Sequence, residues 1–292
     1  AAVPADTRPS NGRTCSVPPS TKHAERTAVL TLYDNFASVA AQKVRLCLAE
    51  KALPWTPAEV DLRGGGMLDP DYLRLNPAGV VPTLVHDGLV LVESTAINEY
   101  LDEAFPEPAL RPATAEGRAH MRIVTKRVDE EIQRATGNVS MAVYIRHHHL
   151  KKSPAELDAY FARMPDPDRI ARQREVIAQG MDAPAVAVGI KVFSRWIDDL
   201  DRRAGAASWL AGEAFTLADI ACIPFVTRLE MLAMDRLWTQ GRCPHLARWW
   251  QACKARPAFK REIADRFPAP FLANMRQHGE QCWPQVAAIL GL

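Results

Sequence analysis

The chain has 292 residues, of which 48% are hydrophobic and 24% are charged, a composition typical of a globular protein with one large or two modest domains. Its 36 basic and 34 acidic residues give a formal net charge of +2, which offers no electrostatic footprint for nucleic acid. No apolar run approaches the roughly 20 residues of a membrane span, and the six cysteines form no CxxC pair. We therefore expect a cytoplasmic protein that binds neither nucleic acid nor membrane and has no disulfide framework or structural zinc site.

The chain divides into regions of different character. Residues 1–27 are rich in proline, serine, threonine and charge without periodicity, which predicts a disordered arm. A small α/β domain is expected over 28–107, a proline-rich linker over 108–116 and an all-helical domain over 117–292.

The α/β region alternates between strand and helix signals. Asp-Gly between two apolar runs is a strong hairpin signal. The expected elements are, in order, a strand over 28–33, a helix with Ala40, Val44, Cys47 and Leu48 on one face, a strand over 55–62, a short helix over 72–75, strands over 83–85 and 89–92, and a helix over 95–105.

Every signal beyond the linker is helical. Apolar residues recur at helical spacing over 121–139 and 186–200. Thr216 and Asp219 form a capping box that opens an apolar helix through Leu232. Pro224 should kink that helix or lie in its first turns.

Val81 and Pro82 stand at the head of the strand over 83–85. Proline lacks the ladder donor and occurs at strand starts, edges or bulges. A cis bond here would turn the backbone of Val81 outward, where its N–H and C=O could pair with an extended ligand as an added strand would. The alternative is a proline that blunts an edge strand.

Glu93 and Ser94 stand where the next strand gives way to a helix. The Ser94 hydroxyl and the first free N–H groups of the helix suit a carboxylate, and Glu93 could accept from an ammonium group. The pair therefore matches an α-amino-acid end, and the alternative is a plain N-cap.

Ser38 lies at or beside the N-terminus of the first helix. A hydroxyl there can donate to a thiolate, and the helix dipole favours negative charge. Such a site would lower the pKa of a thiol from about 8.5 toward neutrality. The alternative is again an N-cap serine.

With these segments in this order, the chain resembles the cytosolic glutathione transferases. The resemblance runs from about residue 29 to 265, on TLYDNFASVAAQKVRLCLAEK (31–51), YLRLNPAGVVPTLVHDGLVLVESTAINEYLDEAFPEPALRP (72–112) and FTLADIACIP (215–224). It implies a thioredoxin-like N-terminal domain, an all-helical C-terminal domain and, usually, a homodimer.

The resemblance also implies glutathione as the cofactor and a role for each motif. The cis-proline loop at Val81-Pro82 would hold the peptide, and Glu93 and Ser94 would receive its γ-glutamyl end. Ser38 matches the serine that contacts sulfur in serine-type members.

The electrophile would then sit between the domains, lined by the first helices of the C-terminal domain and by the tail. Met141, Tyr144 and His148 are candidates for that pocket, although core packing explains the first two nearly as well. Three consecutive histidines on a helix, 147–149, point three ways, so we expect no metal site there.

Two departures from the family pattern bear on the chemistry. Ala40 replaces a cysteine found in many relatives, so a protein–glutathione mixed disulfide is unavailable there and attack by the glutathione thiolate is favoured. Val80 stands where relatives often have a Lys or Gln that helps to bind glutathione. Another residue should therefore supply that part of the glutathione binding.

Within the family, MPDPDRIARQREVI (164–177), the long helical domain and the tail resemble the glutathione-dependent β-aryl etherases of lignin-degrading bacteria. RLEMLAMDRLW (228–238) is similar to tetrachlorohydroquinone dehalogenases, which rely on the missing cysteine. We therefore expect an enzyme that cleaves a β-aryl ether in a small aromatic substrate. The alternatives are a glutathione-dependent dehalogenase or isomerase, and a non-catalytic binding protein on the same fold.

Overall fold

The computed structural model describes residues 29–239 and 241–292, and the arm predicted over 1–27 lies outside them. The first part is built on a four-stranded sheet with the strand order β2-β1-β3-β4. β1 runs parallel to β2 and antiparallel to β3, and β3 is antiparallel to β4. The strands are β1 (Leu30–Asp34), β2 (Thr56–Glu59), β3 (Thr83–His86) and β4 (Leu89–Val92).

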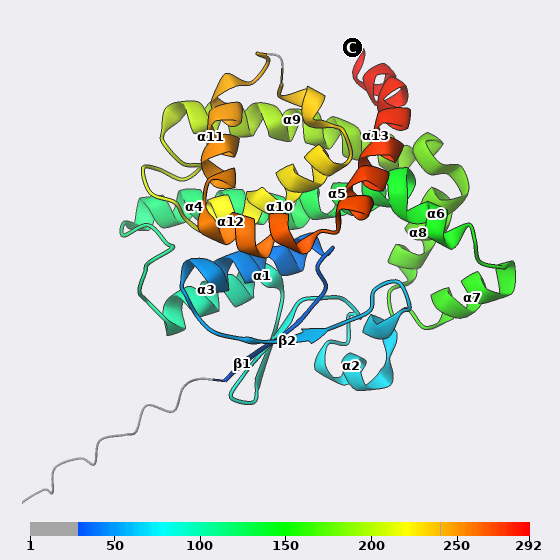
Figure 1. The fold of residues 1–292 in the computed structure, drawn as a ribbon, viewed down its shortest axis with the longest axis horizontal. Helices are drawn as coiled ribbons and strands as arrows, with labels where there is room; N and C mark the ends of the chain where they lie inside the picture. The colour runs from blue at the N-terminus through cyan, green and yellow to red at the C-terminus, as the bar shows by residue number, and fades with distance from the viewer. Residues whose placement is uncertain (1–28, 240) are drawn as a thin grey trace, which may run out of the picture.

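Three helices accompany the sheet, namely α1 (Val39–Glu50), α2 (Pro70–Leu75) and α3 (Ser94–Ala104). α1 packs against α3 and α10, and Figure 1 shows α1 and α3 between the sheet and the later helices. Every residue of α1 from Ala41 to Leu48 is therefore buried, charged side chains included. The predicted β–α order and thioredoxin-like domain are confirmed.

The rest of the described chain is helical, as predicted. Its α-helices are α4 (Ala115–Arg127), α5 (Gln133–Ser140), α6 (Arg146–His149), α7 (Pro154–Ala162), α8 (Pro167–Gln179), α9 (Pro184–Ala206), α10 (Leu217–Met231), α11 (Pro244–Lys254), α12 (Pro257–Glu262) and α13 (Ala269–Leu290). Two π-helical stretches, η2 (Val128–Ile132) and η3 (Met141–Ile145), join α4, α5 and α6. Short 3₁₀ turns are η1 (Gly66–Leu68), η4 (Gly180–Asp182), η5 (Asp235–Leu237) and η6 (Ala264–Arg266).

α10 is the central helix of this domain. The capping box forms as predicted, and Asp219 also accepts from the Trp249 indole at 2.9 Å and from the Leu210 N–H at 3.0 Å. Every residue from Leu217 to Leu229 is buried, and Pro224 lies inside the helix, beyond its first turns. The helix therefore provides a fixed core against which α1 of the first domain packs.

Polar contacts join the two domains. Buried Lys43 of α1 donates to Thr95 at 2.6 Å and to Asp129 of η2 at 2.9 Å. Arg256 at the start of α12 pairs with both carboxylate oxygens of Glu50 at 2.7 Å. The boundaries 28–107, 108–116 and 117–292 stay a prediction.

Among the described residues, no single helix is long and apolar enough to cross a membrane. One pair of helical segments is long and apolar enough only when the two are taken together. They are Pro167–Asp182 and Pro184–Ala206, with a bend of 74° between them.

Candidate active site

The strand register brings the three predicted ligand-binding segments to one end of the sheet. Tyr33 of β1 pairs with Thr83 of β3, and Thr83 pairs with Val92 of β4. The residues after β1, before β3 and after β4 therefore meet at the same edge. These are the segments that carry Ser38, Val81-Pro82 and Glu93-Ser94.

Ser38 is the N-cap of α1, as the sequence indicates. Its backbone is extended, and its Oγ accepts a hydrogen bond from the Ala41 N–H at 3.2 Å. Because the oxygen accepts, the hydroxyl proton is available to donate to an anion. The first turn of α1 carries no acidic residue that would oppose such an anion.

Hydrogen bonds from neighbouring side chains hold the segment before β3. The Val81-Pro82 peptide bond is cis. The carbonyl of Val80 accepts from the Tyr72 hydroxyl at 2.6 Å and from the Asn76 amide at 2.8 Å. Val81 and Pro82, at the head of β3, are both buried.

Glu93 and Ser94 differ in one detail from the expectation. Glu93, and not Ser94, is the N-cap of α3, and its side chain makes no capping hydrogen bond. Glu93 has a φ of 67°, a backbone conformation that is unfavourable for residues other than glycine and is concentrated at functional sites. Its side chain is exposed while Ser94 is buried, so the carboxylate faces outward at the mouth of the helix.

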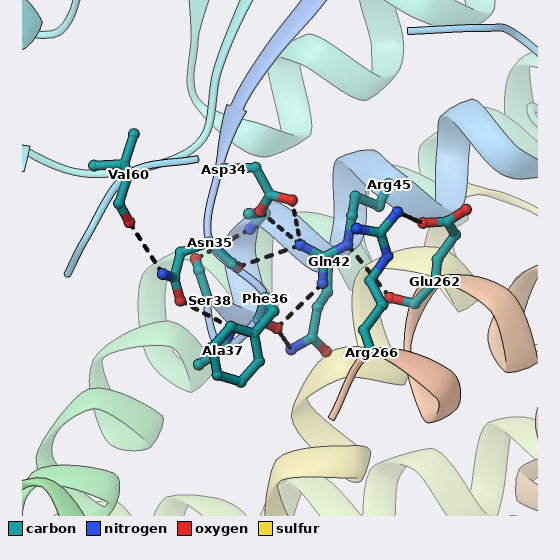
Figure 2. Close-up of polar contacts among 11 residues, drawn as sticks. Asp34, Asn35, Phe36, Ala37, Ser38, Gln42, Arg45, Val60, Glu262 and Arg266 are labelled. Carbon is teal, nitrogen blue, oxygen red and sulfur yellow. Dashed lines mark hydrogen bonds and ion pairs between the residues drawn. The ribbon is translucent and has the colours of Figure 1, made fainter. Parts of the chain in front are cut away.

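A polar network fixes the loop over residues 35–37 that precedes Ser38 (Figure 2). The Asn35 side chain accepts from the Ala37 N–H at 3.0 Å and donates to the Val60 carbonyl at 3.0 Å. Fully buried Arg45 donates to the carbonyl of Asn35 at 3.3 Å and to that of Phe36 at 3.2 Å. The loop therefore presents Ser38 from a rigid support.

An aromatic cluster lies beside this loop and consists of Phe36, Tyr144, Phe267 and Phe271. The Phe36 ring lies 5.4 Å from Phe271 and 5.6 Å from Phe267, and Tyr144 lies 5.4 Å from Phe271, all edge to face. Arg63, from the loop after β2, lies over the Phe271 ring at 5.6 Å and donates to the Tyr144 hydroxyl at 3.4 Å. The cluster thus joins the Ser38 loop, η3 and α13 in one apolar surface between the domains.

Of the three predicted pocket residues, the structure brings Tyr144 to this cluster. Met141 is buried in the core, and the His148 ring contacts His149 at 5.7 Å. The role of both in a pocket stays a prediction. His147 stacks on His278 at 4.2 Å, whereas His149, which meets His148 edge to face, is buried against Tyr160, where burial lowers its pKa to about 4.

Several residues near the site were missed by sequence reasoning. Arg169 of α8 reaches the carbonyl of Gly79 at 3.5 Å, and burial lowers the pKa of its guanidinium. Arg228 of α10 donates to the carbonyl of Ala37. Nothing local in the sequence marks these arginines, because both reach the site from the other domain.

Comparison with known proteins decides the family. The N-terminal domain of glutathione S-transferases matches residues 37–104, and the C-terminal domain of the same family matches residues 191–257. Protein LigF of Sphingobium sp. is 31% identical over 240 residues, which cover 79% of this chain and 91% of LigF. The chain belongs to the glutathione S-transferase family.

Two further likenesses support the membership of this glutathione S-transferase. Glutathione S-transferase 3 of Zea mays is 30% identical over 241 residues, which cover 81% of this chain and 94% of the maize protein. The crystal structure of the β-etherase LigF from Sphingobium sp. matches with a TM-score of 0.75 at 28% identity, over 81% of this chain and 99% of LigF. Members of the family use glutathione as co-substrate, so the predicted cofactor and fold are confirmed at the level of the family.

Proposed function

We propose that this glutathione S-transferase uses the glutathione thiolate to cleave a β-aryl ether. The observation that carries the proposal is the Ser38 hydroxyl, whose oxygen caps α1 and whose proton is left for an anion, beside a cluster of aromatic rings. The likeness to the β-etherase LigF supports the choice of substrate.

In the proposed complex, glutathione lies extended along the head of β3 and pairs with the backbone of Val81, next to Pro82. Glu93 accepts from the γ-glutamyl ammonium, and Ser94 with the first N–H groups of α3 receives its carboxylate. Ser38 donates to the sulfur and stabilises the thiolate over the thiol.

The chemistry is a displacement at the carbon α to a ketone. A bond forms between sulfur and that carbon as the bond from carbon to the aryl oxygen breaks. The departing phenoxide takes a proton from water, so the products are a glutathione thioether and a phenol. A phenoxide is a tolerable leaving group, and the reaction therefore asks mainly for a stabilised thiolate and an apolar site for aromatic rings.

The aromatic cluster would supply that site, with Tyr144 as one wall and α13 as the other. Met141 and His148 are proposed as further lining residues, as the sequence indicates. Family members typically act as dimers, and we propose a homodimer in the cytoplasm for this chain. Light scattering after gel filtration would measure its oligomeric state.

Product analysis tests the proposal. The protein is incubated with glutathione and a β-aryl ether ketone, and in parallel with a chlorinated hydroquinone, and the products are identified by mass spectrometry. A phenol and a glutathione thioether in equal amounts support the proposal. Chloride release without ether cleavage would favour a dehalogenase, and no heat on titration with millimolar glutathione would leave only a non-catalytic protein.

A further inference from the structure

Arg228 is a buried cation that contacts the loop in front of Ser38. Its side chain leaves α10 and is 6% exposed. Its Nη1 donates to the Ser140 hydroxyl at 3.2 Å, and its Nη2 donates to the carbonyl of Ala37, the residue directly before Ser38. Its Nε is buried and has no hydrogen-bond partner in the described part of the chain.

The other strongly buried cations are all paired with carboxylates. Lys43 lies 2.9 Å from Asp129, Lys51 lies 2.8 Å from Asp102, and Arg45 binds Asp34. Over residues 29–239 and 241–292, Arg228 forms no ion pair with a carboxylate. The titratable group that faces it is the phenol of Tyr144 from η3.

The charge of Arg228 is nevertheless present at neutral pH. Burial lowers the pKa of its guanidinium to about 10, which still lies well above 7. An unpaired charge in a protein interior destabilises the folded state, because the lost hydration is not replaced by a nearby countercharge. Its retention beside the Ser38 loop is explained if a bound anion, in place of a protein carboxylate, completes the pair.

We propose that Arg228 is a positioning residue whose charge stabilises the glutathione thiolate at Ser38. The assignment deepens the proposed function and rests on it, since it needs a thiolate at that place. A cation one residue from the Ser38 cap lowers the pKa of a thiol there, because it favours the charged form over the neutral one. Through its bond to Ala37, the same guanidinium also fixes the loop.

The test is the pKa of the bound glutathione thiol, measured by the ultraviolet absorbance of the thiolate in the full-length protein. Arg228→Gln removes the charge and leaves an uncharged amide donor on α10, and it should raise that pKa by about one unit. Arg228→Lys keeps the charge and should stay close to the wild-type value. Arg248→Gln is the matched control, because Arg248 also donates to backbone carbonyls, those of Ala204 and Ala207 at the end of α9.

Activity against pH separates the charge from a merely structural role. At pH values below the wild-type pKa of the bound thiol, kcat/KM of Arg228→Gln should be about tenfold lower than that of the wild type. Above the raised pKa of the variant, its kcat/KM should approach the wild-type value. A loss that is equal at every pH would show that Arg228 only holds the loop. If Arg228→Gln does not fold, Arg228→Met provides the uncharged variant.

The outcomes distinguish the two proposals. A normal thiolate band in the wild type with an unchanged thiol pKa in the uncharged variant would overturn the role of Arg228 alone. The lack of any thiolate band in the wild type with saturating glutathione would overturn the proposed function and the role of Arg228 with it.

Discussion

Arg45 of α1 donates from one nitrogen to both carboxylate oxygens of Asp34, at 2.6 and 2.5 Å, where β1 ends and the Ser38 loop begins. The same guanidinium donates to the carbonyl of Glu262 at 3.3 Å and so ties the loop to α12 of the other domain. The pair is buried, and removing one partner would leave an uncompensated charge in the interior.

Arg45→Met should therefore lower the free energy of unfolding by about 3–5 kcal/mol, measured by urea denaturation. The matched control is Arg74→Met, which breaks an ion pair with Asp71 that is almost wholly exposed. Solvent screens that pair, so its loss should change stability little. Equal losses in the two variants would contradict a structural role for the Arg45 pair.

Ser38→Ala removes the hydroxyl that is proposed to donate to sulfur. The pKa of the bound glutathione thiol should rise, because the charged form loses a hydrogen bond, and kcat/KM at neutral pH should fall about tenfold or more. The pH at which kcat/KM rises should also move to a higher value. Stability should also fall by about 1 kcal/mol through the lost cap.

Ser153→Ala separates the cap from the chemistry. Ser153 caps α7 and accepts from the Glu156 N–H at 3.3 Å, in the same way that Ser38 caps α1. This variant should lose a cap without losing conjugation. Full activity of Ser38→Ala would remove Ser38 from the mechanism, although not from the fold.

The parts of the structure that could be predicted depend on neighbours in sequence. The hairpin at Asp87-Gly88, the Thr216–Asp219 capping box and the cap at Ser38 are each written within a few residues, and all three are present. The strand predicted over 55–62 is shorter, at Thr56–Glu59, because the chain turns at Asp61, whose carboxylate accepts from the Arg63 and Gly64 N–H groups.

The contacts that hold the site in place could not be predicted from the sequence, because they join residues that are far apart in the chain. Arg228 and Ala37 are separated by 191 positions, and Arg45 and Glu262 by 217. An arginine in an apolar helix has no local pattern that names its acceptor. Phe271 was visible only as an aromatic residue of the tail, and its contact with Phe36 follows from the path of α13.

Arg169 is a candidate for the glutathione contact that Val80 does not make. Its half-buried guanidinium reaches Gly79, one residue before Val80, from α8. Arg169→Gln should raise the KM for glutathione about fivefold, because a partly desolvated cation beside the segment proposed to bind the peptide is lost. The effect on kcat should be smaller.

The control for Arg169 is Arg174→Gln on the same helix, where the guanidinium pairs with Asp158 at 2.7 Å. This change should leave the KM for glutathione unaltered. Steady-state kinetics at varied glutathione decides the matter, and an unchanged KM in Arg169→Gln would assign the missing contact to another residue.

Phe271 ties the tail helix to the proposed substrate site. Its ring meets Phe36 and Tyr144 edge to face, and Arg63 lies over it. Phe271→Ala should raise the KM for an aromatic electrophile about 2- to 10-fold, the worth of one aromatic pair, and should leave the KM for glutathione within about twofold.

Phe215→Ala is the matched control, because Phe215 is also half-buried beneath a guanidinium, that of Arg256 at 3.7 Å, in a contact with Trp209. It should not change the KM for either substrate. A small aliphatic electrophile provides the second comparison, since it gains nothing from an aromatic wall. If Phe271→Ala weakens the aliphatic and the aromatic substrate alike, the ring supports the position of α13 and does not line the site.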